Sequence, residues 1–259
     1  MSSALDWSPG LDSQYREVEA NADTGLCLYR HPLSTDLGQL FPLVILFRES
    51  ACHAHWVLLV KYVRARDFLL LLGRLVSMSE IVPFGHHRYR PLQLYLLAHW
   101  PPSQGQLTDR IHLDHPFLDP FLKWWTKPFN VLQGKPLQAP APQLNIFTDA
   151  STNGWGAYYG SQSAAGQWLA TETSRHINKL ELLAIQKAVL HFLPLIRGKV
   201  VVFHSDNSSA GAYLQNQGST YSLPMFQLTW DILLFCQQHG ITLLMRHIQG
   251  RLNALADSL

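Results

Sequence analysis

The sequence predicts an α/β fold over residues 144–259, with a mixed five-stranded sheet flanked by helices, behind a smaller, mostly helical region at residues 1–136. Three observations support it. Short apolar segments separated by glycines open the second half, a helical pattern follows them, and the apolar residues 200–203 then indicate an interior strand covered on both faces. Residues 137–143 carry prolines that suit neither a helix nor a central strand, so we assign them to a linker.

The composition is that of a globular protein with few charges. Of the 259 residues 47% are hydrophobic, but only 15% are charged, against about a quarter in typical domains. A surface this poor in charge suggests a piece that normally packs against something else, such as the remainder of a polyprotein. The net charge of +2 means that any nucleic-acid binding must come from local patches.

Nothing in the sequence indicates a membrane or a secreted protein. The longest apolar runs, Phe41–Phe47 and Phe68–Leu72, are far shorter than the roughly 20 residues that span a bilayer. The first ten residues lack the basic and apolar parts of a secretory signal. Three scattered cysteines favour a reducing compartment, so we expect an intracellular protein, cytoplasmic or nuclear, with no membrane partner.

The first half predicts helices but no chemistry. Residues 1–50 are poorly defined, because the first forty are polar and interrupted by prolines. Further on, apolar periodicity predicts helices at Trp56–Val76, Leu92–His99 and around Pro120–Trp125. A zinc site at Cys52, His53 and His55 is disfavoured, because the paired spacing that closes a tetrahedral site is missing.

The second half predicts the element order β-β-β-α-β-α-α-β-α. In sequence, the expected elements are strands at 144–148, 154–159 and 166–170, a helix at about 179–193, a strand at 199–205, a short helix after Asn207, a helix at about 223–239, a strand at 241–248, and a terminal helix that Asn253 could cap. The glycines and small polar residues between the first three strands indicate an antiparallel meander.

Four carboxylates of this half stand where a purely structural role would not place them. Asp149 and Asp206 end the first and the interior strand, and open α/β sheets bind ligands at such carboxyl ends. Glu181 shares a helix face with Ile185 and Ala188, so a face that should pack on the sheet carries a charge. Asp257 follows in the last helix.

Each acid also has a structural alternative. Asp149 could form a turn, Asp206 could cap the following helix, and Glu181 could complete a capping box with Asn178. Asp257 could be a solvated helix residue. Together, however, acids from two strand ends and a core-facing helix position predict one crevice. Converging carboxylates repel unless a divalent metal lies between them, and oxygen ligands suit Mg²⁺ or Mn²⁺. Two such ions serve the in-line displacement of a phosphodiester.

The segments around these acids resemble the four acidic motifs of type 1 ribonuclease H domains. Within 144–259, Asn153–Ala157, Ser174–Asn178 and Leu214–Thr220 look more narrowly like the ribonuclease H of DIRS-like, tyrosine-recombinase retrotransposons. Upstream, 71–77 and 90–94 resemble the tail of that element's reverse transcriptase, its thumb or connection region. The segments that carry the four motifs are Phe147–Ser151, Leu180–Ala184, Ser205–Asn207 and His247 through Asp257.

The resemblance implies an enzyme that hydrolyses the RNA strand of RNA/DNA hybrids with two Mg²⁺ or Mn²⁺ ions, as part of a retrotransposon reverse transcriptase. It implies that Asp149, Glu181, Asp206 and Asp257 bind metal and that His247 assists product release or proton transfer. Substrate contacts are expected from Ser151, Asn207, Arg175, Lys179 and Arg251, with Arg246 and Trp155 or Tyr158 as further candidates. For the basic residues, ordinary solvation is the alternative.

Two departures from the family pattern leave other hypotheses open. No Tyr-x-Asp-Asp motif occurs, so we do not expect this chain to synthesise DNA. The sequence ends two residues after Asp257, so we expect a truncated last helix that holds this acid poorly. One alternative is a catalytically silent nucleic-acid-binding relic that keeps the fold. Another is a different enzyme of that fold, such as an integrase or exonuclease.

Overall fold

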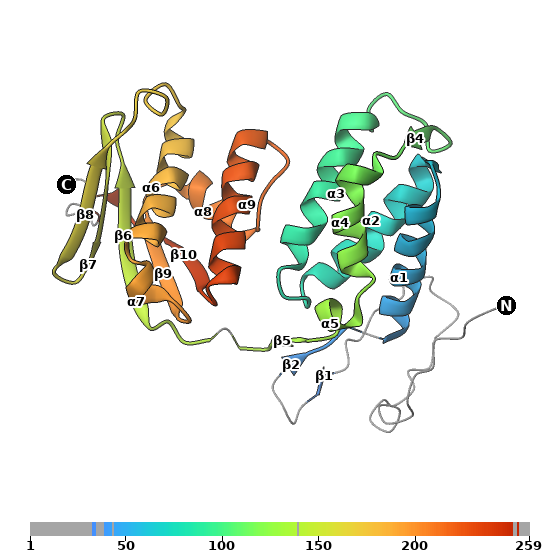
Figure 1. The fold of residues 1–259 in the computed structure, drawn as a ribbon, viewed down its shortest axis with the longest axis horizontal. Coiled ribbons are helices and arrows are strands. Elements are labelled where there is room, and N and C mark those ends of the chain that lie inside the picture. The colour runs from blue at the N-terminus through green and yellow to red at the C-terminus, as the bar shows by residue number, and fades with distance from the viewer. Residues whose placement is uncertain (1–32, 35–38, 43, 139, 251–252, 254–259) are drawn as a thin grey trace.

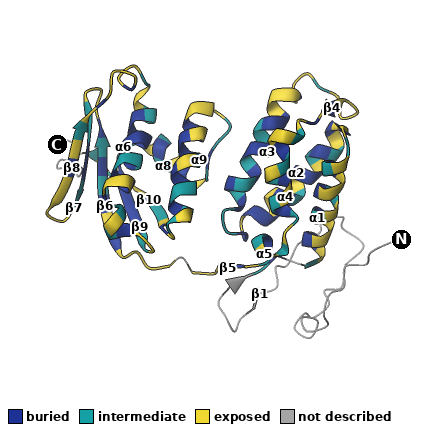
Figure 2. Cartoon of the chain, viewed as in Figure 1, coloured by how far each residue is buried: buried dark blue, intermediate teal, exposed yellow. Residues whose placement is uncertain are grey.

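The computed structural model describes residues 33–34, 39–42, 44–138, 140–250 and 253, which form two halves (Figure 1). Each half has its own hydrophobic core. All buried apolar residues of the helical half's core lie between 46 and 131, and those of the sheet half's core lie between 144 and 245. In Figure 2 the buried residues gather on the sides of the helices that face the sheet or one another.

The helical half is built from five helices and two small sheets. Its elements are β1 (Leu33–Ser34), β2 (Gln39–Leu40), α1 (Val44–Leu59), β3 (Tyr62–Arg64), α2 (Ala65–Ser79), α3 (Gly85–His99), β4 (Arg110–His112), α4 (His115–Trp125), α5 (Pro128–Val131) and β5 (Lys135–Pro136). Strand β3 pairs antiparallel with β4, and β2 lies between β1 and β5. The largest fully buried side chains, Phe68 and Trp125, lie among leucines from α2, α3 and α4.

The predicted helix over Trp56–Val76 is wrong, because the chain forms two helices with strand β3 between them. Helix α1 ends at Leu59, and Tyr62–Arg64 then pairs with Arg110–His112. A three-residue strand whose partner lies far along the chain leaves no periodicity to detect. The other two helices begin earlier than predicted, α3 at Gly85 and α4 at His115, and each contains a proline, Pro91 and Pro120, in its interior.

The sheet half contains the mixed five-stranded sheet that the resemblance to ribonuclease H domains implies. Its elements are β6 (Leu144–Ala150), β7 (Gly154–Tyr159), β8 (Gln162–Gln167), α6 (Ile177–His191), α7 (Leu193–Ile196), β9 (Val200–Ser205), α8 (Ser208–Gln215), α9 (Leu223–Gln238) and β10 (Thr242–His247). The strand order is β10-β9-β6-β7-β8. Strands β10, β9 and β6 pair in parallel, whereas β7 pairs antiparallel with both β6 and β8. Helices α6, α8 and α9 cover one face (Figure 1).

Most predicted elements of this half are confirmed within a few residues, with one clear exception. The third strand runs over Gln162–Gln167 rather than 166–170, because a two-residue turn joins Tyr159 to Gln162 and the polar edge strand starts at once. The predicted terminal helix lies outside the described residues, apart from Asn253. Within the described part of the chain, no helix is both long and apolar enough for a membrane span.

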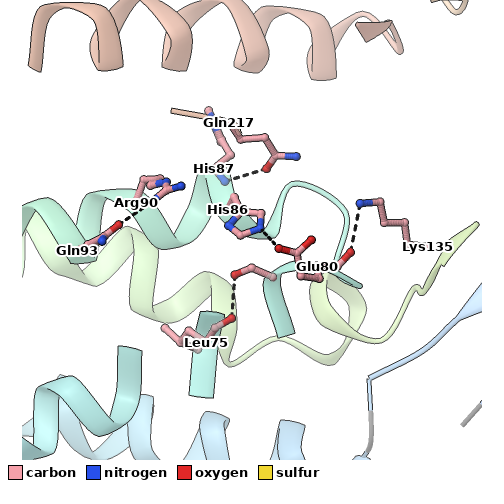
Figure 3. A network of polar contacts seen from close by, with 9 residues as sticks. Leu75, Glu80, His86, His87, Arg90, Gln93, Lys135 and Gln217 are labelled. Atoms are coloured by element: carbon pink, nitrogen blue, oxygen red, sulfur yellow. Dashed lines mark hydrogen bonds and ion pairs between the residues drawn. The ribbon is translucent and has the colours of Figure 1, made fainter. Parts of the chain in front are cut away.

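The two halves meet where the start of α3 contacts α9 and the turn before it. The His87 ring stacks on Trp230 with centroids 3.6 Å apart, and Phe121 from α4 meets the same indole edge-on at 5.6 Å. The backbone N–H of His87 donates to Gln217 Oε1 at 2.9 Å, so a side chain of the sheet half caps the first turn of α3 (Figure 3). This contact ties the helical half to the domain that carries the acids.

Candidate metal centre

Two neighbouring parallel strands bring Asp149 and Asp206 to the same edge of the sheet. In the ladder between β6 and β9, Phe147 is paired with His204. Each aspartate follows two residues later, Asp149 near the end of β6 and Asp206 directly after β9. Because residues two apart on a strand point to the same face, the register itself places both carboxylates side by side.

Helix α6 supplies the third carboxylate. Glu181 lies one turn into the helix, only 3% exposed, among buried apolar residues that face the sheet. Ser205 Oγ donates to Glu181 Oε2 at 3.4 Å, which connects the helix to the end of β9. One ligand oxygen from each of Asp149, Glu181 and Asp206 lies within 4.8 Å of the other two.

Burial and repulsion act together on Glu181. Removal from water and then the neighbouring carboxylates of Asp149 and Asp206 raise the pKa of Glu181 to about 8, although Ser205 and a backbone hydrogen bond at Ala150 oppose the shift. Without a cation this carboxyl would therefore hold its proton at neutral pH. A divalent ion between the three side chains would remove both the repulsion and the uncompensated charge.

The structural alternatives for Glu181 and Asp206 do not describe these residues. The N-cap of α6 is His176, whose ring accepts from the backbone N–H of Asn178, so Asn178 is inside the helix. The N-cap of α8 is Asn207, whose Oδ1 accepts from the Ala210 N–H at 2.9 Å. Neither carboxylate is therefore the helix cap at its position.

Two residues that the sequence analysis did not assign to the site support it. Asn253 is fully buried, and its Nδ2 donates to Asp149 Oδ1 at 3.2 Å and to the Thr148 carbonyl at 3.0 Å. The backbone of Gly250 lies so close to Asp206 that a Cβ there would come within 2.9 Å of Oδ2. The sequence offered Asn253 only as a candidate cap of the terminal helix, which lies outside the described residues. A single asparagine or glycine in a polar segment gives no signal until the register of the strands is known.

Four further predicted residues belong to the C-terminal part of the chain. His247 ends β10 exposed to solvent and is paired with Ser205, so it lies at the same sheet edge as the acids. Arg246 precedes it, also exposed. Asp257 and Arg251 lie outside the described residues.

The expected substrate-binding residues flank the acids. Ser151 Oγ accepts from the Gly154 N–H at 3.2 Å and so shapes the turn after β6. Asn207 Nδ2 donates to Asn178 Oδ1 at 3.0 Å, which fixes the amide beside Asp206. Arg175 and Lys179 are half-buried at the start of α6, where burial and then Arg175 lower the pKa of Lys179. Both cations therefore lie at the start of the helix that carries Glu181.

The three carboxylates form a candidate site for a hard divalent cation. All three offer oxygen atoms, which Mg²⁺ and Mn²⁺ prefer, and each comes from a helix or strand end that packing holds in place. Within the described residues, no second group of His, Cys, Asp or Glu side chains converges in this way, and the residues around Cys52 form no such cluster.

No family model matches the chain, and no curated protein does. Among solved structures, similar chains include LC11-RNase H1, isolated from compost by a metagenomic approach, at 15% identity and a TM-score of 0.39, covering 46% of this chain and 92% of that one. The same enzyme in complex with an RNA/DNA hybrid matches at 17% identity and 0.40, covering 45% and 93%. The foamy viral protease-reverse transcriptase in complex with double-stranded DNA matches at 14% and 0.31, covering 82% and 37%.

Proposed function

We propose that the chain is a metal-dependent ribonuclease H that hydrolyses the RNA strand of RNA/DNA hybrids. The observation that carries the proposal is the buried Glu181, which meets Asp149 and Asp206 at the carboxyl edge of a mixed sheet. A buried acid surrounded by acids destabilises the fold unless it serves a cation. The motif resemblance around the same three residues supports this choice of substrate and reaction.

Under this proposal each residue of the site has a definite role. Asp149, Glu181 and Asp206, together with Asp257, would hold two Mg²⁺ or Mn²⁺ ions, which when bound supply the chemistry of an in-line phosphodiester displacement. Asn253 holds the Asp149 carboxylate in its orientation through the 3.2 Å hydrogen bond. His247, at the same sheet edge, would move a proton or assist the release of the cleaved strand.

The flank of the site favours a nucleic-acid backbone. Arg175 and Lys179 place two cations at the start of the helix that carries Glu181, and Arg251 would add a third. Ser151 and Asn207 offer polar atoms on either side of the acids. In a hybrid, 2′-hydroxyl groups in the minor groove distinguish the RNA strand, and short polar side chains suit such contacts.

We further propose that the chain is part of the polyprotein of a DIRS-like retrotransposon and acts inside the cell, in the cytoplasm or nucleus, beside the remainder of a reverse transcriptase. The motif segments that carry this resemblance are its support, together with a charged-residue content of only 15%. Co-purification of the chain with the matching polymerase segment, expressed separately, would test the association.

The test of the enzyme is Mg²⁺-dependent cleavage of a labelled RNA/DNA hybrid, beside a DNA duplex of the same sequence. We expect cleavage of the hybrid alone, and its loss in Asp149→Asn and in Asp206→Asn, because each change removes a ligand charge at constant volume. Asp231→Asn, at an exposed position of α9, is the matched control and should cleave at the parent rate. Near-parental cleavage by either site variant would contradict the assignment.

A metal titration separates this enzyme from a catalytically silent relic of the same fold. An intact site should gain thermal stability from millimolar Mg²⁺ or Mn²⁺, because the ion binds only the folded state. A folded protein that binds the hybrid, gains no stability from either ion and cleaves nothing would favour the relic. Equal cleavage of hybrid and DNA duplex would instead favour another nuclease of this fold.

A further inference from the structure

The two-stranded ribbon of β3 and β4 gathers cations on its outer face. Val63 and Ile111 are paired across the ribbon and buried in the helical core, at 2% and 3% exposure. The residues that alternate with them are therefore turned to solvent. With two neighbours in the sequence they form what we call the basic ribbon, made of Lys61, Tyr62, Arg64, Arg66, Arg110 and His112, all exposed.

Several cations of the basic ribbon lie where like charges repel each other or the helix dipole disfavours them. Arg64 and Arg110 stand directly opposite in the antiparallel register, an arrangement that destabilises a strand pair when both carry the same charge. Arg64 is also the N-cap of α2, and Arg66 lies in its first turn, where the helix dipole disfavours positive charge. The fold therefore keeps three guanidinium groups where intramolecular electrostatics opposes them.

Nearby acids do not neutralise these cations. Among the described residues, Lys61, Arg64, Arg66 and Arg110 take part in none of the ion pairs. The Asp109 carboxylate beside them accepts from the Gln106 N–H at 2.6 Å and from the Trp100 indole N–H at 3.2 Å, so it is held within its own loop. Asp67 lies next to Arg66 in the sequence and takes part in none of these ion pairs.

The form of the basic ribbon suits an extended anion. Two cations lie close to the Tyr62 ring, the Arg110 guanidinium 5.2 Å and the Lys61 ammonium 5.8 Å from its centroid. Beside it is a shallow hollow of about 340 Å³, lined by Arg64, Arg66, Asp67, Leu70, Leu107 and Thr108. The first amides of α2 are already bonded to the carbonyls of Asp109 and Leu107, so contacts with an anion would come from side chains.

We propose that the basic ribbon binds the phosphodiester backbone of a nucleic-acid duplex. Charge complementarity selects this occupant, because cations spaced along a strand pair match phosphates spaced along a backbone, and arginine binds phosphate oxygens in a fork. The inference rests on the proposed function for the identity of the duplex, which is the hybrid held at the carboxylates. The ribbon belongs to the other half of the molecule, at the end away from the sheet in Figure 1. It would therefore hold a part of the duplex that the carboxylates do not contact.

The test is equilibrium binding of a labelled RNA/DNA hybrid to the full chain in EDTA, at several salt concentrations. In Arg64→Gln/Arg66→Gln/Arg110→Gln we expect the affinity to fall at least about tenfold and the slope of log K against log salt to flatten by about two, because each lost phosphate contact removes nearly one released counterion. Arg48→Gln/Lys127→Gln/Arg197→Gln removes the same charge from exposed positions elsewhere and should change the slope little.

The remaining outcomes decide against the inference. Equal losses in the two triple variants would show a general effect of net charge, and unchanged binding in the first would show that the ribbon is not used. Polyglutamate that binds the parent chain more tightly than the hybrid does, and loses this affinity in the triple variant, would replace nucleic acid by an acidic protein partner. If the triple variant fails to fold, Arg110→Gln alone should still flatten the slope by about one. Because binding is measured without metal, failure of cleavage leaves this result intact.

Discussion

The two halves of the molecule each concentrate side chains of one charge at one place. In the sheet half, Asp149, Glu181 and Asp206 converge on one edge. In the helical half, Arg64 and Arg110 face each other across a two-stranded ribbon. The first group is buried and suits a small cation, whereas the second is exposed and suits a long anion. Under the proposed function the first group would hold the metal ions and the second would hold another part of the duplex.

Glu172 shows what a structural acid looks like in the same half. It is 8% exposed, close to the 3% of Glu181. Burial by itself would raise the pKa of Glu172, but the Leu169 N–H and Lys187 act more strongly and lower it. The fold thus stabilises the charged form of Glu172 and disfavours the charged form of Glu181. This difference, together with the neighbouring carboxylates, is why we propose Glu181 and not Glu172 as a metal ligand.

Exchanging the two glutamates for glutamine should separate the roles most sharply. We expect Glu181→Gln to lower hybrid cleavage by about 10³-fold or more, since it removes a metal ligand and leaves the volume unchanged. Glu172→Gln should leave cleavage per folded molecule within about threefold, but destabilise the protein by about 1 to 2 kcal/mol, because Lys187 loses its partner. Cleavage assays and chemical denaturation on both variants measure this. Similar cleavage losses in the two would remove the distinction.

The contribution of Glu181 to the pH dependence of stability should have the opposite sign to that of Glu172, because the pKa of Glu181 is raised and that of Glu172 is lowered. Because the pKa of this group is raised to about 8 in the folded, metal-free protein, its folded form holds a proton that the unfolded chain has released above about 4.3. Its contribution therefore falls as pH rises from about 5 to about 8, by up to roughly 1.4 kcal/mol per unit.

The variant Glu181→Gln isolates that contribution. Burial, and then the Arg88 charge, lower the pKa of His87 to about 3, so His87 makes stability rise with pH up to about 6.5 and would mask the trend in the parent alone. Denaturation in EDTA at pH 5 and pH 8 should show the variant gaining on the parent, by about 1 to 3 kcal/mol at the higher pH. A constant difference would mean that Glu181 titrates normally.

A smaller effect is expected from the backbone that approaches Asp206. In Gly250→Ala the added Cβ would lie 2.9 Å from Asp206 Oδ2, so the carboxylate or the strand end must shift. We expect cleavage to fall about tenfold, as small displacements of a catalytic group commonly cost that much. Gly211→Ala, in helix α8 with open space around its Cβ, should leave cleavage unchanged and slightly raise stability. Parental cleavage in both variants would show that Asp206 can move away from a Cβ at position 250 without loss of activity.

The sequence predicts most of the sheet half because its signals are local. Val200–Phe203 indicates an interior strand without knowledge of its partners, and Asn207 predicts the start of α8, which it does cap. The convergence of Asp149, Glu181 and Asp206 follows once the strand order is known. The strand order itself was not predicted, because pairing of β6 with β9 joins residues more than fifty positions apart.

The helical half and the supporting residues of the site were less predictable, for a common physical reason. Tyr62–Arg64 becomes a strand only through Arg110–His112, and Asn253 becomes a second support of Asp149 only through a contact across the domain. Neither has a local pattern. The prediction of one helix over Trp56–Val76 failed for this reason. The helical spacing of apolar residues continues through Tyr62–Arg64, but pairing with Arg110–His112 makes this segment a strand.

The smallest effect on cleavage, and the one that tests whether the two halves act together, should come from Trp230→Ala. The indole stacks on His87, meets Phe121 edge-on and lies 5.5 Å from the Arg88 guanidinium, so its loss removes the centre of the contact between the halves. We expect unfolding to cost about 2 kcal/mol less and cleavage to stay within about threefold, because no acid is touched. Tyr221→Ala removes a ring that is 96% exposed on the turn before α9 and should change neither stability nor cleavage.

If the basic ribbon holds the duplex that the carboxylates cleave, Trp230→Ala should also weaken hybrid binding as far as the triple arginine variant does. The reason is that the ribbon would no longer be held in a fixed position relative to the carboxylates. Unchanged binding with separate unfolding of the two halves would mean that the ribbon and the carboxylates bind nucleic acid independently.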